Sequence, residues 1–137
     1  MSNFVYKTTL RRLGDHVVEA TGGTDGRVVM GPKGTPHSFT PVELLLAAIA
    51  GCSGMDLCTL SERDGVEVGG FEVRVRGVKP IGATRLSNID VTYVVDGADP
   101  EAVAPLVAEV AELCTVGLTV NEGCPVEHSL AAPDRGA

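Results

Sequence analysis

The chain has 137 residues, of which 44% are hydrophobic, 21% charged and 4% aromatic, and this balance predicts a single globular domain over residues 1–137. Its formal net charge of −7 argues against binding to nucleic acid or to an anionic membrane through net charge. The longest apolar run, residues 44–51, is shorter than the roughly 18 residues of a membrane helix. The first residues show no secretory signal, so we expect a cytoplasmic protein without a membrane span.

The first third of the chain is predicted to form strands and turns. Short β-prone runs occur at residues 4–6, 16–20 and 27–30, and a glycine-rich turn at residues 22–26 separates the last two. A loop of glycine and proline, residues 31–38, then leads to the clearest helix start in the sequence.

The first predicted helix begins with a capping box. Thr40 is the N-cap, Pro41 takes the first helical position, and Glu43 follows three residues after the cap. The next residues are apolar on almost every face, which predicts a buried helix at the centre of the fold, running to about Glu62.

The second half is predicted to contain two strands, a helix and a last short strand. Alternating residues at 66–78 and 89–95 predict half-buried strands. Asp99 and Pro100 open a second helix that is amphipathic to Leu113. A strand-like run covers residues 126–130, and residues 131–137 are expected to form a frayed tail. The order of these elements predicts an α+β domain.

Four cysteines narrow the possible chemistry: Cys52, Cys58, Cys114 and Cys124. In a reducing compartment they act as core thiols, metal ligands or redox groups rather than as a disulfide framework. None of the spacings is C-x2-C or C-x4-C, and the three histidines show no zinc-binding pattern. We therefore predict no metal site.

Cys52 and Cys114 fall in two different predicted helices. Small residues surround Cys52, so one interpretation is that both thiols only pack in the core. If the helices lie side by side, the alternative is a redox pair, in which one sulfur attacks a peroxide and the other closes a disulfide on it. Cys58 is six positions from Cys52 on another helix face, and we interpret it as a core thiol.

Two segments resemble the OsmC/Ohr family of organic hydroperoxide reductases. Residues 41–52, PVELLLAAIAGC, are similar to the family's P-x-E-L-L-L-A-A-L-A-G-C segment, and residues 112–119, ELCTVGLT, resemble its second-cysteine segment. The separation of 62 residues between Cys52 and Cys114 is also similar to the family's.

The resemblance implies an OsmC-like fold, in which antiparallel sheets wrap around two central helices in an intertwined homodimer. It implies an antioxidant thiol peroxidase that reduces organic hydroperoxides to alcohols, with Cys52 as peroxidatic and Cys114 as resolving thiol. It implies no metal or organic cofactor, and electrons from a small dithiol or a lipoylated protein.

Two positions depart from the family pattern. The turn that reads G-G-R-D-G in the hydroperoxide-resistance branch has Thr24 in place of the catalytic arginine, and Arg27 is a candidate substitute. The branch's glutamate directly follows the helix proline, whereas here the carboxylate is Glu43, one residue later. One residue turns a helix by about 100°, so capping is the simpler role for Glu43.

The lost arginine matters because a thiolate in apolar surroundings needs a cation. Arg27, Arg63 or a residue of a partner subunit are the candidates, while Asp56, one turn after Cys52, opposes ionisation. Cys124, in a Cys-Pro-Val segment, is a rival resolving thiol, although we favour Cys114.

Two other functions stay open. One is a non-catalytic OsmC-like small-molecule-binding protein that has lost the catalytic arginine. The other is a housekeeping domain whose cysteines only pack.

Overall fold

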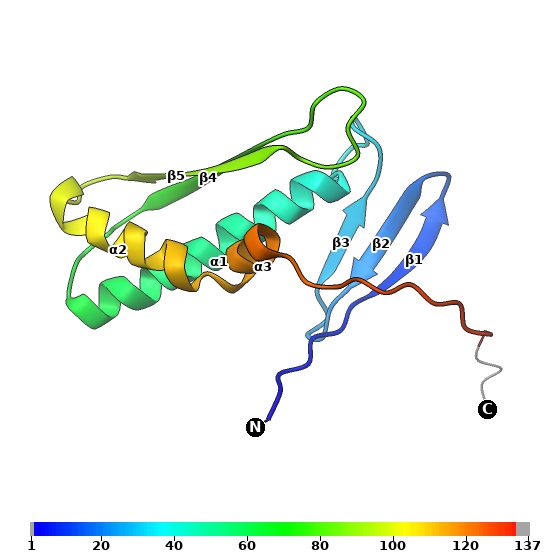
Figure 1. Ribbon diagram of the computed structural model, residues 1–137, viewed down its shortest axis with the longest axis horizontal. Coiled ribbons are helices and arrows are strands. Elements are labelled where there is room, and N and C mark those ends of the chain that lie inside the picture. Colours follow the sequence, from blue (N-terminus) through cyan, green and yellow to red (C-terminus); the bar gives the residue numbers. More distant parts are fainter. Residues whose placement is uncertain (1, 134–137) are drawn as a thin grey trace.

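A computed structural model describes residues 2–133 and shows an α+β fold with two separate antiparallel sheets (Figure 1). The elements follow in the order β1 (Thr9–Gly14), β2 (Val17–Thr21), β3 (Arg27–Met30), α1 (Pro41–Asp64), β4 (Phe71–Val78), β5 (Asn88–Val95), α2 (Pro100–Leu113) and α3 (Thr115–Glu122). The predicted fold class is therefore confirmed.

The two sheets differ in what they contact. The hairpin of β4 and β5 lies along α1, and α2 packs on another side of the same helix (Figure 1). The three-stranded sheet β1-β2-β3 stands to one side of this body, and its main contacts are among its own strands. The helices and the β4/β5 hairpin therefore form the body of the domain, and α1 is its central element.

The start and the end of α1 follow the predicted signals. The Thr40 side chain accepts a hydrogen bond from the backbone N–H of Glu43 at 3.2 Å, and the Glu43 carboxylate accepts one from the backbone N–H of Thr40 at 2.9 Å. Gly65, with φ of 66°, ends the helix in the left-handed conformation that glycine adopts without strain. The capping box is confirmed, and the helix ends two residues beyond the predicted Glu62.

The β4/β5 hairpin confirms the predicted alternation. Phe71 pairs with Val95 and Val73 with Tyr93, and along both strands half-buried residues alternate with exposed ones. β4 begins at Phe71 rather than at the predicted residue 66, because Gly69, with φ of 55°, turns the backbone before it. The residues before that turn instead contribute Val68 to the core.

Two further expectations are corrected, and one element was not predicted. Residues 4–6 form no strand: they are exposed and have no neighbouring strand to pair with, whereas β1 pairs with β2 from Thr9 onward. Residues 126–130 are also exposed and irregular, since no sheet edge takes them up. The segment after Cys114 forms a two-turn helix, α3, bent by 56° from α2.

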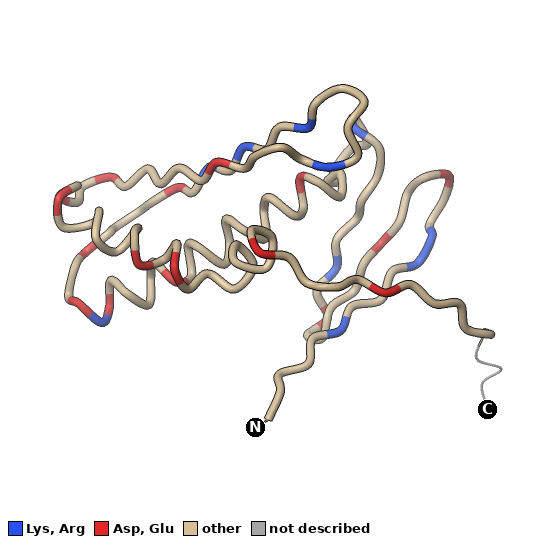
Figure 2. Tube along the Cα trace, in the orientation of Figure 1, with Lys and Arg blue, Asp and Glu red and all other residues tan. Residues whose placement is uncertain are grey.

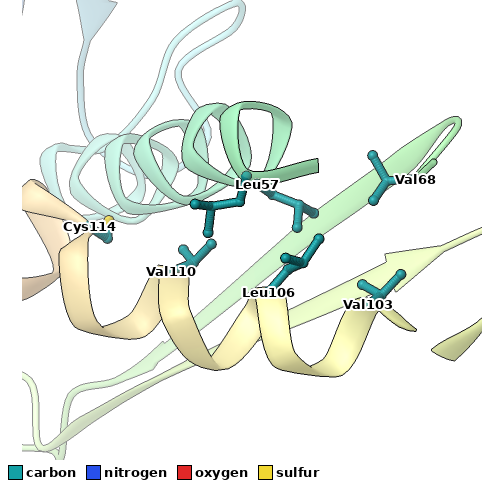
Figure 3. Close-up of a cluster of buried hydrophobic side chains, with 7 residues drawn as sticks. Leu57, Val68, Val103, Leu106, Val110 and Cys114 are labelled. Carbon is teal, nitrogen blue, oxygen red and sulfur yellow. The ribbon is translucent and has the colours of Figure 1, made fainter. Parts of the chain in front are cut away.

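The core lies between α1 and α2. Its buried members are Leu57, Leu60, Val68, Val103, Leu106, Val110 and Cys114. In Figure 3 the leucine and valine side chains of the two helices point toward one another, and Cys114 sits at the end of α2 beside α1. The second cysteine is thus part of the same packed cluster that holds the helices together.

Over its full length, α1 is more apolar than the short run of residues 44–51 indicated. By length and hydropathy this helix alone, and α2 with α3 as one bent pair, resemble membrane spans. In this fold α1 packs against β4, α2 and α3, and a central core helix requires the same composition.

Candidate functional site

A cavity of about 810 Å³ opens between α1, β5, α2 and α3. Most of its lining is apolar, and Leu45, Ile49, Ile89, Val91, Val107 and Leu118 contribute to it. Its polar and sulfur-bearing lining includes Ser53, Tyr93 and Cys114. This combination is typical of a pocket for a small, largely apolar molecule with a few polar groups at one place.

Two of the four cysteines meet beside this cavity. Cys52 lies in the middle of α1 and Cys114 lies at the junction of α2 and α3, and packing of α1 against α2 brings them together. The two sulfur atoms and a carboxylate oxygen of Asp56 all lie within 4.8 Å of one another. Packing of the helices side by side, as predicted, therefore brings two thiols and one carboxyl group together.

Cys114 is buried, with 4% of its surface exposed, and it is held by local hydrogen bonds. It is the N-cap of α3, where its Sγ accepts a hydrogen bond from the backbone N–H of Gly117 at 3.4 Å. The hydroxyl of Ser53, also buried, lies 3.4 Å from the same sulfur. The N-cap position thus ties this sulfur to the first turn of α3.

Cys52 is in a less favourable setting for ionisation. Burial, above all, raises the pKa of its thiol, and the neighbouring Cys114 and Asp56 raise it further. A hydrogen bond from the backbone N–H of Val116, in the first turn of α3, lowers the pKa of this thiol. The prediction that Asp56 disfavours ionisation of Cys52 thus agrees with the position of its carboxylate beside the sulfur.

Asp56 itself lacks a partner for one of its oxygens. Its Oδ2 atom is buried and makes no hydrogen bond within the described residues. Its charge also helps to raise the pKa of Tyr93, although burial is the larger cause and the Ser53 hydroxyl acts in the other direction. A buried carboxylate oxygen without a partner is costly for the folded state.

The candidate cations lie elsewhere in this chain. Arg27 donates to Glu19 on the neighbouring strand at 3.1 Å. Arg63 is the sole basic residue of the three helices, and it is paired with Asp64 and with Glu109 on α2 at 2.6 Å each. Figure 2 shows the same separation, with Lys and Arg on the strands and their connections and almost none along the helices. Neither arginine is brought to Cys52.

The other candidate residues are also separated from the two thiols. Glu43 remains in its capping box, beside a smaller surface hollow lined by Leu46 and Val73. Cys58 is exposed, which corrects its interpretation as a core thiol, because α1 instead contributes Leu57 and Leu60 to the core. Cys124 is exposed beyond the end of α3.

Sequence reasoning missed three residues of this region. Ser53 and Tyr93 contact the thiol cluster, and Arg85, from the connection between β4 and β5, lines the cavity. Ser53 directly follows Cys52, which is the one signal that the sequence offers. Tyr93 and Arg85 arrive through tertiary packing and carry no local signature.

Comparison with known proteins decides the family. Residues 33–129 match the sequence profile described as OsmC-like protein. The chain belongs to the OsmC-like family. A relative is Protein YhfA of Escherichia coli K12, with 31% identity over 107 residues that cover 75% of this chain and 80% of YhfA. The predicted family resemblance is therefore confirmed.

Solved structures show the same OsmC-like fold. An OsmC-like protein from Mycoplasma pneumoniae superimposes with a TM-score of 0.77 at 16% identity, covering 88% of this chain and 89% of that one. A hypothetical protein from Aquifex aeolicus VF5 gives 0.75 at 22% identity, covering 88% and 89%. The organic hydroperoxide resistance protein OhrB of Bacillus subtilis gives 0.58 at 23% identity, covering 85% and 90%. At these identities the matches establish the fold.

Proposed function

We propose that this OsmC-like protein is a thiol-dependent peroxidase that reduces organic hydroperoxides to alcohols through Cys52 and Cys114. The observation that carries the proposal is the meeting of these two sulfurs, from different helices, beside a largely apolar cavity. The name of the structurally similar OhrB, an organic hydroperoxide resistance protein, is in keeping with this chemistry.

The reaction has two steps on the protein. The Cys52 thiolate attacks the outer oxygen of the hydroperoxide, the O–O bond breaks, and the alkoxide leaves as an alcohol after taking a proton. Cys52 is then a sulfenic acid. The Cys114 thiolate attacks this sulfur and forms a disulfide, and the sulfenic oxygen leaves as water.

An external dithiol returns the protein to its reduced form. One of its thiolates attacks the Cys52–Cys114 disulfide, and its second thiol releases the mixed disulfide, so that the external dithiol leaves oxidised. A small dithiol or a lipoylated protein supplies this chemistry.

A second copy of the chain completes the site in this proposal. α1 leaves Met55 73% exposed in its middle and Val42 and Leu45 partly exposed near its start. A partner would cover exposed apolar side chains of this central helix. The β1-β2-β3 sheet stands beside the body (Figure 1), and we expect it to pack on the partner in the dimer. An intertwined homodimer supplies both, and it also offers Arg27 of a partner subunit as a cation.

The test is consumption of cumene hydroperoxide in the presence of an excess dithiol. We expect turnover in the wild type, loss of turnover in Cys52→Ser and in Cys114→Ser, and full turnover in the control Cys58→Ser, whose thiol is exposed on the same helix. Absence of turnover in the wild type, or full activity of Cys52→Ser, contradicts the proposal.

The order of attack needs a separate experiment because Cys114, not Cys52, lines the cavity. With one equivalent of hydroperoxide and a sulfenic-acid trap, Cys114→Ser should accumulate the trapped adduct on Cys52. Accumulation on Cys114 in the Cys52→Ser variant, with none in Cys114→Ser, would exchange the two roles.

A specific observation favours the alternative of a non-catalytic binding protein. The groups that shift the pKa of Cys52 include no basic side chain within residues 2–133. If the wild type binds apolar ligands in the cavity but reduces no hydroperoxide, this alternative replaces the peroxidase.

A further inference from the structure

We propose that in the fully reduced protein Cys52, Asp56 and Cys114 bind one thiophilic divalent cation such as Zn²⁺, with water from the cavity in the fourth position. This inference goes beyond the peroxidase and does not depend on it. It also reverses the expectation from sequence spacing, because 62 residues separate the two cysteines and no zinc motif contains them.

The ligand set has the right chemistry and size. Thiolate sulfur and carboxylate oxygen are both zinc ligands, and in a tetrahedral site with metal–sulfur bonds of about 2.3 Å the ligand atoms lie about 3.6–3.8 Å apart. Here the three atoms lie within 4.8 Å of one another. Shifts of the side-chain atoms by about one ångström would close the difference.

The unsatisfied oxygen of Asp56 is an independent indication of a ligand. Its Oδ2 is buried without a hydrogen-bond partner among the described residues, and an oxygen of the same carboxylate lies within 4.8 Å of both sulfur atoms. Buried polar atoms in native proteins are almost always paired. A cation at this point gives the carboxylate its missing partner.

Ionisation of both thiols would make the cluster strongly acidic. Two thiolates and a carboxylate would carry three negative charges, and the surrounding α1, α2, α3 and β5 contain one basic residue, Arg63, while Arg85 from the β4–β5 connection lines the cavity. Arg63 is already paired with Asp64 and Glu109. A divalent metal would deprotonate the thiols as it binds and neutralise most of this charge.

The fourth coordination position is accessible. Cys114 lines the cavity, so a metal bound to its sulfur faces space that admits water. Three protein ligands and one open position are typical of reactive zinc sites, whereas structural sites are closed by four protein ligands.

The experiment uses Co²⁺ as a spectroscopic probe for Zn²⁺ in anaerobic, dithiol-free reduced protein. We expect one equivalent of Co²⁺ per chain, a thiolate-to-cobalt charge-transfer band and tetrahedral d–d bands, all removed by one equivalent of Zn²⁺. The Cys58→Ser/Cys124→Ser double variant, which lacks both exposed thiols, should bind as the wild type does. Cys114→Ser should lose the charge-transfer band.

Asp56→Asn tests the third ligand. It should weaken Co²⁺ binding by at least about 10–100-fold, the loss that even an outer-shell change often causes. Oxidation of the wild type to the Cys52–Cys114 disulfide should abolish binding, and reduction should restore it, a readout that does not depend on a variant folding. Absence of stoichiometric binding in the reduced wild type, binding lost in the double variant, or unchanged affinity in Asp56→Asn overturns the proposal.

Discussion

Asp56 and Cys52 lie one helical turn apart on α1, and the carboxylate raises the pKa of the thiol. Asp56→Asn removes this charge while keeping the side-chain shape, so we expect the pKa of Cys52 to fall and more of the thiol to ionise near neutral pH. Each unit by which the pKa falls increases the thiolate fraction but makes the thiolate less nucleophilic. The net effect is that alkylation of Cys52 by iodoacetamide should accelerate by about threefold for each unit.

Mass spectrometry of the Cys52 peptide measures this rate against pH. Glu62→Gln is the matched control, because it removes a carboxylate from the same helix that does not act on Cys52. An Asp56→Asn rate profile that coincides with that of the wild type would show that the carboxylate does not control the thiol.

The pH dependence of peroxide reduction follows from the same group. Because burial raises the pKa of Cys52 above its usual range, its thiolate fraction increases throughout the alkaline range up to that raised value. With Cys52 as the attacking thiol, the single-turnover rate of the wild type with cumene hydroperoxide should rise steadily from neutral to alkaline pH. A rate that is already constant at neutral pH would require a cation that the single chain does not bring to Cys52.

At this scale the sequence predicts part of the site. Cys52 and Cys114 stand out through their motifs, and Asp56 through its helical spacing from Cys52. Ser53, Tyr93 and Arg85 are not predictable in this way, because β5, the β4–β5 connection and α1 meet only in the folded chain. The sequence also offers no means of finding a ligand set that is split between two helices.

The capping box determines where α1 begins. Glu43 has two candidate roles, one in this cap and one in catalysis, and substitutions distinguish them. Thr40→Ala removes the side-chain acceptor of the cap and should lower the free energy of unfolding by about 1 kcal/mol in urea titrations at fixed protein concentration. Glu43→Gln keeps an oxygen that can accept the Thr40 N–H bond, so it should change stability less and leave peroxide turnover intact. A large loss of turnover in Glu43→Gln would instead assign this carboxylate to catalysis.

Packing between α1 and α2 brings the two thiols together. Leu57 is fully buried between these helices, and Leu57→Ala should lower the free energy of unfolding by about 2–5 kcal/mol, since it leaves a cavity in the core. Exposed Thr59 on the same helix provides the control, because Thr59→Ala should change the unfolding midpoint little. Equal effects of the two substitutions would contradict the described core.

The elements that sequence reasoning placed correctly are those with local signals. α1 and α2 have proline after a capping residue, and β4 and β5 alternate cleanly. The start of β1 and the irregularity of residues 126–130 depend on which segments find a pairing partner, and α3 depends on Cys114 as its cap. Strand pairing is a tertiary effect that a local pattern does not carry, and cysteine is not among the residues that typically signal an N-cap.

At the scale of the whole molecule, the central helix exposes apolar side chains, among them Met55, which the proposed homodimer would cover. We therefore expect a dimer in sedimentation analysis, and Met55→Lys, on the uncovered flank of α1, should shift the equilibrium toward monomer. Ile81→Lys is the control, because Ile81 is fully exposed in the connection after β4. A wild type that sediments as a monomer at all concentrations would remove the partner subunit from the account.

The central claim is that Cys52 and Cys114 react as a redox pair, and disulfide mapping tests it most directly. After reduced wild-type protein reacts with one equivalent of cumene hydroperoxide, free thiols are blocked and the peptides are analysed by mass spectrometry. The account predicts a Cys52–Cys114 linkage, with Cys58 and Cys124 blocked as free thiols. A Cys52–Cys124 linkage, or four free thiols after the peroxide is added, would contradict it.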